Sequence, residues 1–372
     1  APMCPFSTAS GLIMVKVRLL IIFLVFGLEI TKFTPTDLPM ALHDLSRLLA
    51  QKPHRLVLTS HWNPDGDAVG STLGLAHYLQ GKGHSVQVVF PNSPSAPVSK
   101  APGFSAPWVH LYDSDAAGCS AIFSQAEGLF SLDYNTSSRV GEAMQAELEA
   151  FDGFKVIIDH HQEPDGGYDF VYSQTTKSST AEMVYDFIAT DGGTLDVAAA
   201  DCLLMGLITD TGSFRFPSVS ASTLKAASAL VEVGAEPHVI HERLFESNPP
   251  SRLKLWGRGL NSLEILANGR ATLAYLTAQD IAECGFEAGD TEGLVNQGLG
   301  ITGVSLSAFA REDASGKVKL SFRSKGEVDV NAFSRAHWNG GGHIHAAGGS
   351  AEGNLAEILP LLRHTITDYL SA

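Results

Sequence analysis

The sequence contains few cysteines, and no two of them form a closely spaced pair. Cys4, Cys119, Cys202 and Cys284 lie far apart in the 372 residues. This spacing argues against a zinc knuckle and against a disulfide framework, and it is typical of a protein from a reducing compartment. We therefore expect the protein to be cytoplasmic.

The sequence has no apolar run long enough to suggest a membrane span. The uncharged run from residue 19 to residue 28 has only ten residues, whereas a transmembrane helix needs about 20. We therefore expect no stable membrane span. Lys16 and Arg18 give the run a basic flank like that of a signal peptide, but no small-x-small cleavage site follows. Residues 1–40 are interpreted as an extension upstream of a start at Met40, an export signal, or a hydrophobic arm packed on the body.

Basic side chains are also scarce. The chain has 25 Lys and Arg against 40 Asp and Glu, a formal net charge of −15. A protein that follows a long nucleic acid needs a positive surface that releases counterions. The charge balance therefore argues against long duplex nucleic acid as a partner. A small anionic substrate remains compatible with it if cations are supplied locally.

The length and the 44% apolar content predict two folded domains. Strands alternate with helices over residues 41–235, which predicts an α/β domain with a parallel sheet covered on both faces. Residues 236–258 are expected to be a linker, and residues 259–372 a smaller α+β domain that begins with a hairpin at Asn268-Gly269. Helices are expected at 66–79, 140–150, 179–189, 197–208, 222–233 and 355–370, and strands at 55–60, 85–90, 128–132, 154–159, 304–310 and 317–322.

Polar side chains follow three of the predicted strands at their carboxyl ends. These residues are His61, Asp65 and Asp67 after the first strand, Asp133 after the third, and Asp159, His160 and His161 at the end of the fourth, with Asp210 after the helix at 197–208. The carboxyl ends of parallel strands meet at one edge of a sheet, where ligands bind. Each group alone has an ordinary structural explanation as a turn, a helix cap or a surface pair. Their coincidence at three strand ends favours a functional site.

Divalent metal ions are the natural partners of such a cluster. Four or more neighbouring carboxylates repel one another, and without a cation several of them would take up protons. Six side chains provide enough ligands for two ions if one carboxylate bridges them: His61, Asp65, Asp67, Asp133, His160 and Asp210. Imidazole and carboxylate ligands without a thiolate suit manganese or magnesium-like ions better than structural zinc.

At these residues the sequence resembles the DHH phosphoesterase superfamily. The resemblance rests on the segment HWNPDGDAVGS from His61 to Ser71, on Asp133, on the Asp-His-His triplet at 159–161 and on the Asp-Thr-Gly triplet at 210–212. The segment GGGHIHAAG from Gly340 to Gly348 is similar to the signature of the substrate-binding domain called DHHA1. The resemblance covers residues 41–372 and leaves residues 1–40 outside.

Three further segments resemble the two-domain subfamily of bifunctional oligoribonucleases and pAp phosphatases: SLDYN from Ser131 with Arg139, SSTAE from Ser178, and DTGSFRF from Asp210. That resemblance implies two Mn²⁺ ions, with Mg²⁺ or Co²⁺ as substitutes. One ion would be held by His61, Asp65 and Asp133, and the other by Asp67, Asp133, His160 and Asp210, so that Asp133 bridges them. The resemblance also implies that His161 faces the scissile phosphate and that Asp159 orients the histidines.

The smaller domain is expected to select the substrate. Gly341 and Gly342 let backbone N–H groups approach a phosphate, with His343 as an additional donor. Arg323, with Ser324 beside it, provides a planar fork suited to a terminal phosphate. Arg139 is open to two interpretations, a phosphate contact or a structural ion pair. Trp338 is either a base-stacking residue or a hinge or core residue.

The activity implied is hydrolysis of short oligoribonucleotides, about two to five nucleotides long, to mononucleotides, and of 3′-phosphoadenosine 5′-phosphate (pAp) to AMP. The partners expected are therefore short oligonucleotides and small bisphosphorylated nucleotides. A phosphodiesterase acting on cyclic or linear dinucleotides (c-di-AMP, pApA) is the alternative. A catalytically silent nucleotide-binding regulator is disfavoured because all six ligands are present. A homodimer stays open.

Overall fold

The structure is a computed structural model that describes residues 40–287, 289–313 and 316–371. Residues 41–372 form one compact unit. The three interpretations of residues 1–40 fall almost wholly on residues outside the described part. Within the described part, no helix has the length and apolarity needed to cross a bilayer.

The first half of this unit is built on a six-stranded sheet in which every pair of neighbouring strands is parallel, in the order β3-β2-β1-β4-β5-β6. The strands are β1 (Arg55–Thr59), β2 (Ser85–Phe90), β3 (Val109–Leu111), β4 (Gly128–Leu132), β5 (Phe154–Asp159) and β6 (Phe170–Ser173). The central strands are almost continuously apolar and buried, as expected for a sheet that is covered on both faces. The carboxyl ends of β1, β4 and β5 lie side by side because these strands are neighbours.

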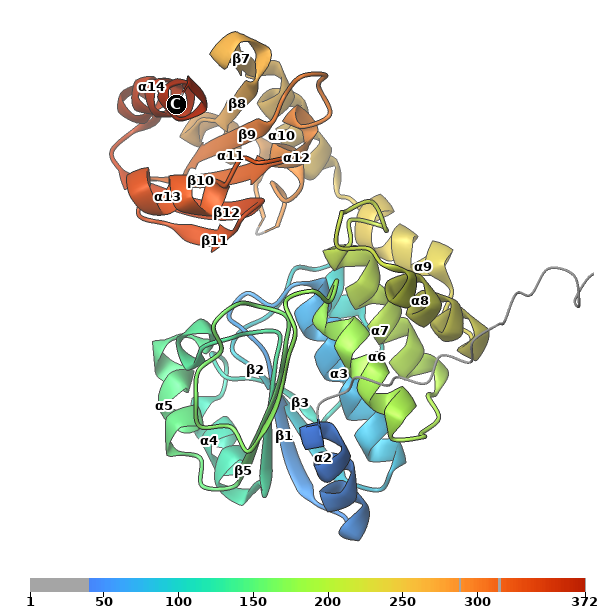
Figure 1. Cartoon of the computed structure of the whole chain (residues 1–372). Helices are drawn as coiled ribbons and strands as arrows, with labels where there is room; N and C mark the ends of the chain where they lie inside the picture. Colours follow the sequence, from blue (N-terminus) through green and yellow to red (C-terminus); the bar gives the residue numbers. More distant parts are fainter. Residues whose placement is uncertain (1–39, 288, 314–315, 372) are drawn as a thin grey trace, which may run out of the picture. The chain divides into compact units, whose positions relative to one another are not determined.

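Helices cover both faces of this sheet (Figure 1). They are α2 (Met40–Gln51), α3 (Gly66–Gly81), α4 (Ala116–Gln125), α5 (Glu142–Ala150), α6 (Thr180–Thr190), α7 (Val197–Asp210) and α8 (Ala221–Val233). Helices α4 and α5 lie on one side, where Val57 and Leu129 of the sheet pack against Phe123 and Met144. Helices α3, α6 and α7 gather on the other side.

Glycines allow α3 and α7 to pack unusually closely. A Cβ atom at Gly70 would lie 2.4 Å from the carbonyl oxygen of Cys202, and one at Gly206 would lie 2.7 Å from an Oδ atom of Asp67. Any larger side chain at these two positions would push the helices apart. The close packing therefore fixes the start of α3, which carries Asp67, against α7, which ends at Asp210.

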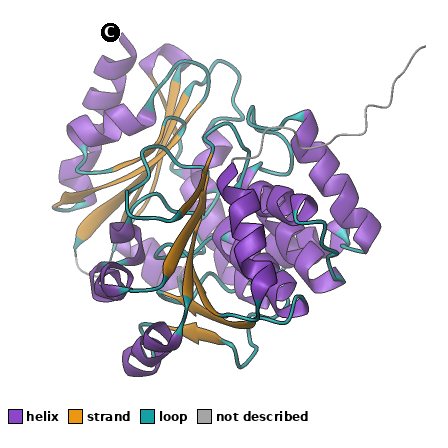
Figure 2. Ribbon diagram, turned by 60° about the horizontal axis from the view of Figure 1, so that its bottom comes forward, coloured by secondary structure: helices purple, strands orange, loops and turns teal. Residues whose placement is uncertain are grey.

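Short helices lead from this sheet to a second one. They are α9 (Pro237–His241), a π-helical turn (Glu242–Glu246) and α10 (Pro250–Asn261). The second sheet is mixed, in the order β11-β12-β10-β9-β8-β7, and only its β8–β9 pair is parallel. Its strands are β7 (Glu264–Leu266), β8 (Ala271–Leu276), β9 (Leu306–Glu312), β10 (Lys317–Ser324), β11 (Gly341–His343) and β12 (Ala346–Glu352). Figure 2 shows the strands of both sheets in orange among the helices.

The second sheet has its own core. Its helices are α11 (Ala278–Cys284), α12 (Leu294–Gly298), α13 (Val330–His337) and α14 (Leu355–Ser371). Phe322 of β10 packs with Phe333 of α13, and Leu362 and Ile366 of α14 complete the cluster. Trp338 is 5% exposed and belongs to this core. Of its two interpretations, the core residue is confirmed and base stacking was wrong.

The observed fold confirms the predicted parallel-sheet α/β domain followed by a smaller α+β domain, and the sheet of the second domain is mixed. The hairpin at Asn268-Gly269 forms between β7 and β8. The sequence prediction missed the short edge strands β3 and β6, strand β12, and helices α4, α11, α12 and α13. It was also wrong in expecting a loop around Gly341, which lies in β11 opposite Gly348. The glycines fit this hairpin because a Cβ atom at Gly342 would lie 2.4 Å from the carbonyl oxygen of Ala346.

Candidate metal and phosphate site

Asp133 lies at the centre of the candidate site. It directly follows β4, and its backbone φ is +65°, in the left-handed region that Asp and Asn tolerate better than most residues. Its Oδ2 lies 3.6 Å from Nε2 of His61, and its Oδ1 lies 3.6 Å from Nε2 of His160. The two oxygens of this buried carboxylate therefore face different groups of side chains.

His61 and Asp65 form the group on one side of Asp133. Nδ1 of His61 lies 2.9 Å from the carbonyl oxygen of Trp62, which can only accept a hydrogen bond, so Nδ1 carries the proton. Nε2 is thereby left to face the carboxylates. Asp65 caps α3 through one oxygen, which accepts hydrogen bonds from the N–H groups of Asp67 and Ala68 at 3.0 Å each. Its other oxygen has no part in this cap.

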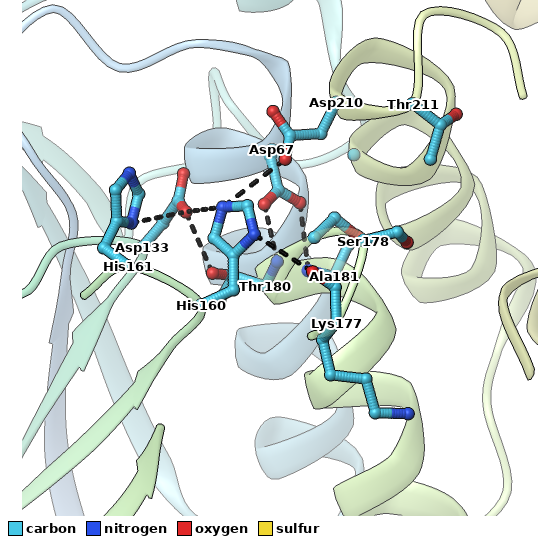
Figure 3. A network of polar contacts seen from close by, with 12 residues as sticks. Asp67, Asp133, His160, His161, Lys177, Ser178, Thr180, Ala181, Asp210 and Thr211 are labelled. Carbon is cyan, nitrogen blue, oxygen red and sulfur yellow. Dashed lines mark hydrogen bonds and ion pairs between the residues drawn. The ribbon is translucent and has the colours of Figure 1, made fainter. Parts of the chain in front are cut away.

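Asp67, Asp210 and His160 form the group on the other side. The buried carboxylate of Asp67 accepts hydrogen bonds from the backbone N–H groups of Thr180 (2.7 Å) and Ala181 (2.9 Å) at the start of α6. Nε2 of His160 lies 3.4 Å from Oδ2 of Asp210, and its Nδ1 lies 3.4 Å from the carbonyl oxygen of Lys177. Figure 3 shows these carboxylates gathered around His160.

His161 is hydrogen-bonded to Asp159, which is not a member of either group. Its Nδ1 lies 2.6 Å from Oδ1 of Asp159, and its backbone N–H donates to the other oxygen of that carboxylate at 3.1 Å. Asp159 is fully buried, so its carboxylate fixes the orientation of the His161 ring. The ring of His343 stacks on His161 with centroids 4.6 Å apart. This contact joins the GGGH segment to the cluster within the unit of residues 41–372.

The electrostatics of the cluster reflect buried negative charge. Burial and the neighbouring carboxylates of Asp133, Asp210 and Asp65 hold the pKa of Asp67 well above its usual range. Burial, together with Asp65 and Asp133, also raises the pKa of Asp210, to about 7. Burial alone would raise the pKa of Asp133 too, but hydrogen bonding to His61 and the nearby histidines outweigh it and hold that pKa well below its usual range. Ionised Asp67 and Asp210 therefore need additional positive charge nearby.

The donor atoms fit divalent cations. Among the described residues, three groups have ligand atoms that all lie within 4.8 Å of one another: His61, Asp65 and Asp133; Asp67, His160 and Asp210; and Asp133, His160 and His161. The first two groups share no residue, and Asp133 turns one oxygen toward each. Nitrogen and carboxylate donors without sulfur suit manganese-like ions. All six side chains predicted as ligands are thus brought together.

The predicted substrate-binding residues of the second sheet have mixed surroundings. Arg323 lies on β10, its Nη1 donates to the carbonyl oxygen of Phe322 at 3.0 Å, and burial lowers the pKa of its guanidinium. The hydroxyl of Ser324 donates to the carbonyl oxygen of Val328 at 2.6 Å. The backbone N–H of Gly342 donates to Oδ1 of Asn331 at 3.0 Å. Arg323 is therefore better placed than Ser324 or Gly342 to offer its donors to an anion.

The sequence prediction assigned no role to Thr180 and Glu182, which support the cluster through hydrogen bonds. Thr180 donates its hydroxyl to Oδ1 of Asp133 at 2.9 Å, in addition to its N–H bond with Asp67. Glu182, 1% exposed, accepts hydrogen bonds from four residues. These residues are Ser178, Lys177, Ser222 and Thr223. The available signal was the N-cap residue Ser179 with Glu182 three positions later, a pattern typical of a helix start.

Comparison with known proteins gives matches over both halves of the chain. The model of the DHH family, N-terminal domain, matches residues 55–207, and the DHHA1 domain model matches residues 271–372. The chain is 31% identical over 310 residues to the bifunctional oligoribonuclease and PAP phosphatase NrnA of Thermus thermophilus, which covers 80% of this chain and 84% of that protein. It is 27% identical over 343 residues to the cyclic-di-AMP phosphodiesterase GdpP of Bacillus subtilis, covering 88% of this chain but 49% of that protein.

A solved structure is similar over nearly the whole chain. It is the crystal structure of an exopolyphosphatase-related protein from Bacteroides fragilis, with a TM-score of 0.85 and 30% sequence identity. The match covers 91% of this chain and 98% of that one. Both the DHH and the DHHA1 regions therefore occur together in related proteins of similar length.

Proposed function

The chain belongs to the DHH family, and on that premise we propose that it is a metal-dependent phosphoesterase that hydrolyses very short oligoribonucleotides to mononucleotides and pAp to AMP. The observation that carries the proposal is the position of Asp133, whose two oxygens face two separate groups of nitrogen and carboxylate donors. The related oligoribonuclease and PAP phosphatase of Thermus thermophilus supports the substrate class.

Two Mn²⁺ ions are proposed to occupy the site. His61, Asp65 and Asp133 would hold one of them, and Asp67, Asp133, His160 and Asp210 the other. Ions bound there would lower the pKa of an attacking water and neutralise charge on the phosphoryl group. The second oxygen of Asp65 and the Nε2 atoms of His61 and His160, which face the carboxylates, would provide lone pairs for this purpose.

His161 is proposed to act on the phosphate rather than on the metal. Asp159 binds its Nδ1 and supports the protonated ring, since this hydrogen bond raises the pKa of His161 despite its burial. A protonated His161 can stabilise negative charge on the phosphoryl oxygens or give its proton to the leaving oxygen. Residues 41–235 are the proposed catalytic domain, residues 236–258 the linker and residues 259–372 the substrate-binding domain.

Metal removal and replacement test the proposal directly. Protein stripped with a chelator should hydrolyse neither the dinucleotide pApA nor pAp, and Mn²⁺ should restore both activities. Titration of the stripped protein with Mn²⁺, followed by electron paramagnetic resonance, should reach two bound ions per chain. Full activity in the presence of chelator, or turnover of neither substrate with Mn²⁺, would contradict the proposal.

Replacing Arg323 with alanine should weaken substrate use without stopping chemistry. Loss of a charge-assisted contact to a terminal phosphate should lower kcat/KM for pAp about tenfold, mainly through KM. Lys319→Ala is the matched control, because Lys319 is an exposed cation four residues away on the same strand. An equal loss in both variants, or a loss in kcat alone for Arg323→Ala, would contradict the assignment of Arg323 to substrate binding.

The alternative function is hydrolysis of a cyclic dinucleotide, which the similarity to the cyclic-di-AMP phosphodiesterase of Bacillus subtilis favours. Turnover of c-di-AMP, linear pApA and pAp by the same Mn²⁺-loaded protein separates the two functions. A kcat/KM for c-di-AMP well above those for pApA and pAp would favour the alternative. The main proposal expects the reverse order.

A further inference from the structure

Trp62 places a large exposed aromatic ring beside the site. It follows His61 directly, and its side chain is 47% exposed. Its carbonyl oxygen is the group that orients His61. A tryptophan that is 47% exposed, one residue from a candidate ligand, has the position needed to contact a substrate bound at the site.

The backbone that carries Trp62 is held from two sides. The N–H of Trp62 donates to the carbonyl oxygen of Arg139 at 2.7 Å. Asn63 and Asn92 exchange two hydrogen bonds, from the N–H of Asn63 to the side chain of Asn92 (2.7 Å) and from that side chain back to Asn63 (2.9 Å). The ring is therefore carried on a fixed support, which reduces the entropy lost when a ligand stacks on it.

Gly141 provides the surface on which the indole rests. A Cβ atom at Gly141 would lie 3.2 Å from Cε3 of Trp62, and the backbone φ of Gly141 is +88°, where a side chain would be strained. Glycine thus permits the six-membered ring of the indole to lie against the backbone. The ring is supported at this contact while much of it remains exposed.

Arg139, on the segment hydrogen-bonded to Trp62, is a cation suited to phosphate. Arg139 lies in the 3₁₀ turn Ser137–Val140, two residues before the Gly141 that supports the indole. The carbonyl oxygen of Arg139 accepts the hydrogen bond from the backbone N–H of Trp62. An exposed aromatic ring that follows a candidate metal ligand, on a segment hydrogen-bonded to one that carries an arginine, matches a nucleotide, which has a flat base joined to phosphates.

We propose that Trp62 is the stacking platform for a nucleobase of the substrate, and hence a specificity-determining residue that favours nucleotides over base-free phosphates. The proposal rests on the phosphoesterase function proposed above and adds the residue that recognises the base. A second exposed aromatic, Phe216, follows Asp210 in sequence, but its ring lies over Gly212 of its own turn. Trp62 differs in being tied to Arg139.

Kinetics on a substrate with and without bases test the role of Trp62. The substrates are pApA and the same 5′-phosphorylated dinucleotide with both bases replaced by hydrogen. Trp62→Ala should lower kcat/KM for pApA about tenfold, the effect of one lost stacking contact, mainly through KM. It should change kcat/KM for the abasic analogue less than about twofold. Trp62→Phe, which keeps an aromatic ring, should recover most of the loss.

Two other aromatic residues make the test specific. Phe245 is also 47% exposed but lies in the π-helical turn after α9, so Phe245→Ala should leave both substrates unaffected. Equal losses on pApA and on the abasic analogue would mean that the Trp62 side chain supports the site without recognising a base, and would overturn the proposal. So would an unchanged kcat/KM in Trp62→Ala, or the base-dependent loss appearing in Phe216→Ala instead.

Equilibrium binding separates this proposal from the proposed activity. Isothermal titration of protein loaded with Ca²⁺ in place of Mn²⁺, with pAp and with inorganic pyrophosphate as ligands, measures binding without relying on turnover. Trp62→Ala should weaken pAp binding about tenfold and leave pyrophosphate binding unchanged. If the wild-type protein hydrolyses neither dinucleotide, the proposed function fails while this result still decides the role of Trp62. Equal affinity of wild type and Trp62→Ala for pAp would overturn the stacking proposal.

Discussion

Asp133→Asn is expected to abolish phosphoester hydrolysis, lowering kcat by about a thousandfold or more. The carboxylate faces His61 with one oxygen and His160 with the other. An amide keeps one carbonyl oxygen but replaces the second oxygen with a hydrogen-bond donor, which cannot bind a cation. One replacement therefore removes the only proposed ligand that is shared by both ions.

Asparagine is the informative replacement because of the backbone at this position. Asp133 has φ of +65°, a conformation in which alanine would add strain of order 1 kcal/mol. Asparagine tolerates it, and its carbonyl oxygen can still accept the hydrogen bond from Thr180. Loss of activity in Asp133→Asn is then attributable to the missing oxygen rather than to a distorted turn.

Metal stoichiometry and activity should fall together in this variant. Mn²⁺ titration followed by electron paramagnetic resonance should give fewer than two ions per chain, with an unchanged far-ultraviolet circular dichroism spectrum. Asp152→Asn is the control, because Asp152 is an exposed carboxylate of the same half of the chain outside the three donor groups. Two bound ions and near-normal turnover in Asp133→Asn would rule out its bridging role.

The position of Asp133 was predictable from sequence because its strand has a simple pattern. GLFSL is a short, mostly apolar run, and the carboxylate of Asp133 follows it directly. The residue that follows a buried parallel strand lies at the carboxyl edge of the sheet. His61 and His160 were predictable for the same reason, because they follow the ends of the buried strands β1 and β5. The edge strands β3 and β6, with three and four residues, lack this pattern because they are too short and too exposed to require it.

Other features depend on contacts between segments that are distant in sequence. The hydrogen bonds that hold Asp67 come from backbone N–H groups of α6. Almost every residue type has a backbone N–H group, so the sequence does not indicate which residues donate. Gly342 looked like part of a loop because glycine is rare in strands, yet β12 can approach β11 only if that residue has no side chain. Such features appear only once the chain is folded.

Glu182 is the clearest such residue, and we predict that Glu182→Gln will weaken Mn²⁺ binding about ten- to hundredfold. Its Oε2 accepts hydrogen bonds from Ser178 and from Thr223 of α8, and its Oε1 accepts from Ser222 of α8 and from Lys177. The carbonyl oxygen of Lys177 lies 3.4 Å from Nδ1 of His160. Glu182 thus ties the segment behind His160 to the starts of α6 and α8.

A glutamine cannot replace these contacts. Its amide nitrogen would face either the ammonium group of Lys177 or the backbone N–H of Ser178, each of which can only donate. Lys177 would also lose one of its two carboxylate partners, the other being Asp186. For a network this deeply buried, the expected cost to the free energy of unfolding is about 2–3 kcal/mol. The larger functional effect arises because the carbonyl of Lys177 and the first N–H groups of α6 would no longer be held in place.

Asp186→Asn distinguishes positioning from general destabilisation. It removes the other partner of Lys177 but leaves every hydrogen bond from Ser178, Ser222 and Thr223 to Glu182. We expect it to lower the melting temperature while keeping Mn²⁺ affinity within about twofold of wild type. Glu182→Gln should lower both, and Glu182→Asp, whose side chain is one methylene shorter, should not restore the metal affinity. If the two glutamate variants and Asp186→Asn lose stability alike while all bind Mn²⁺ normally, Glu182 is structural only.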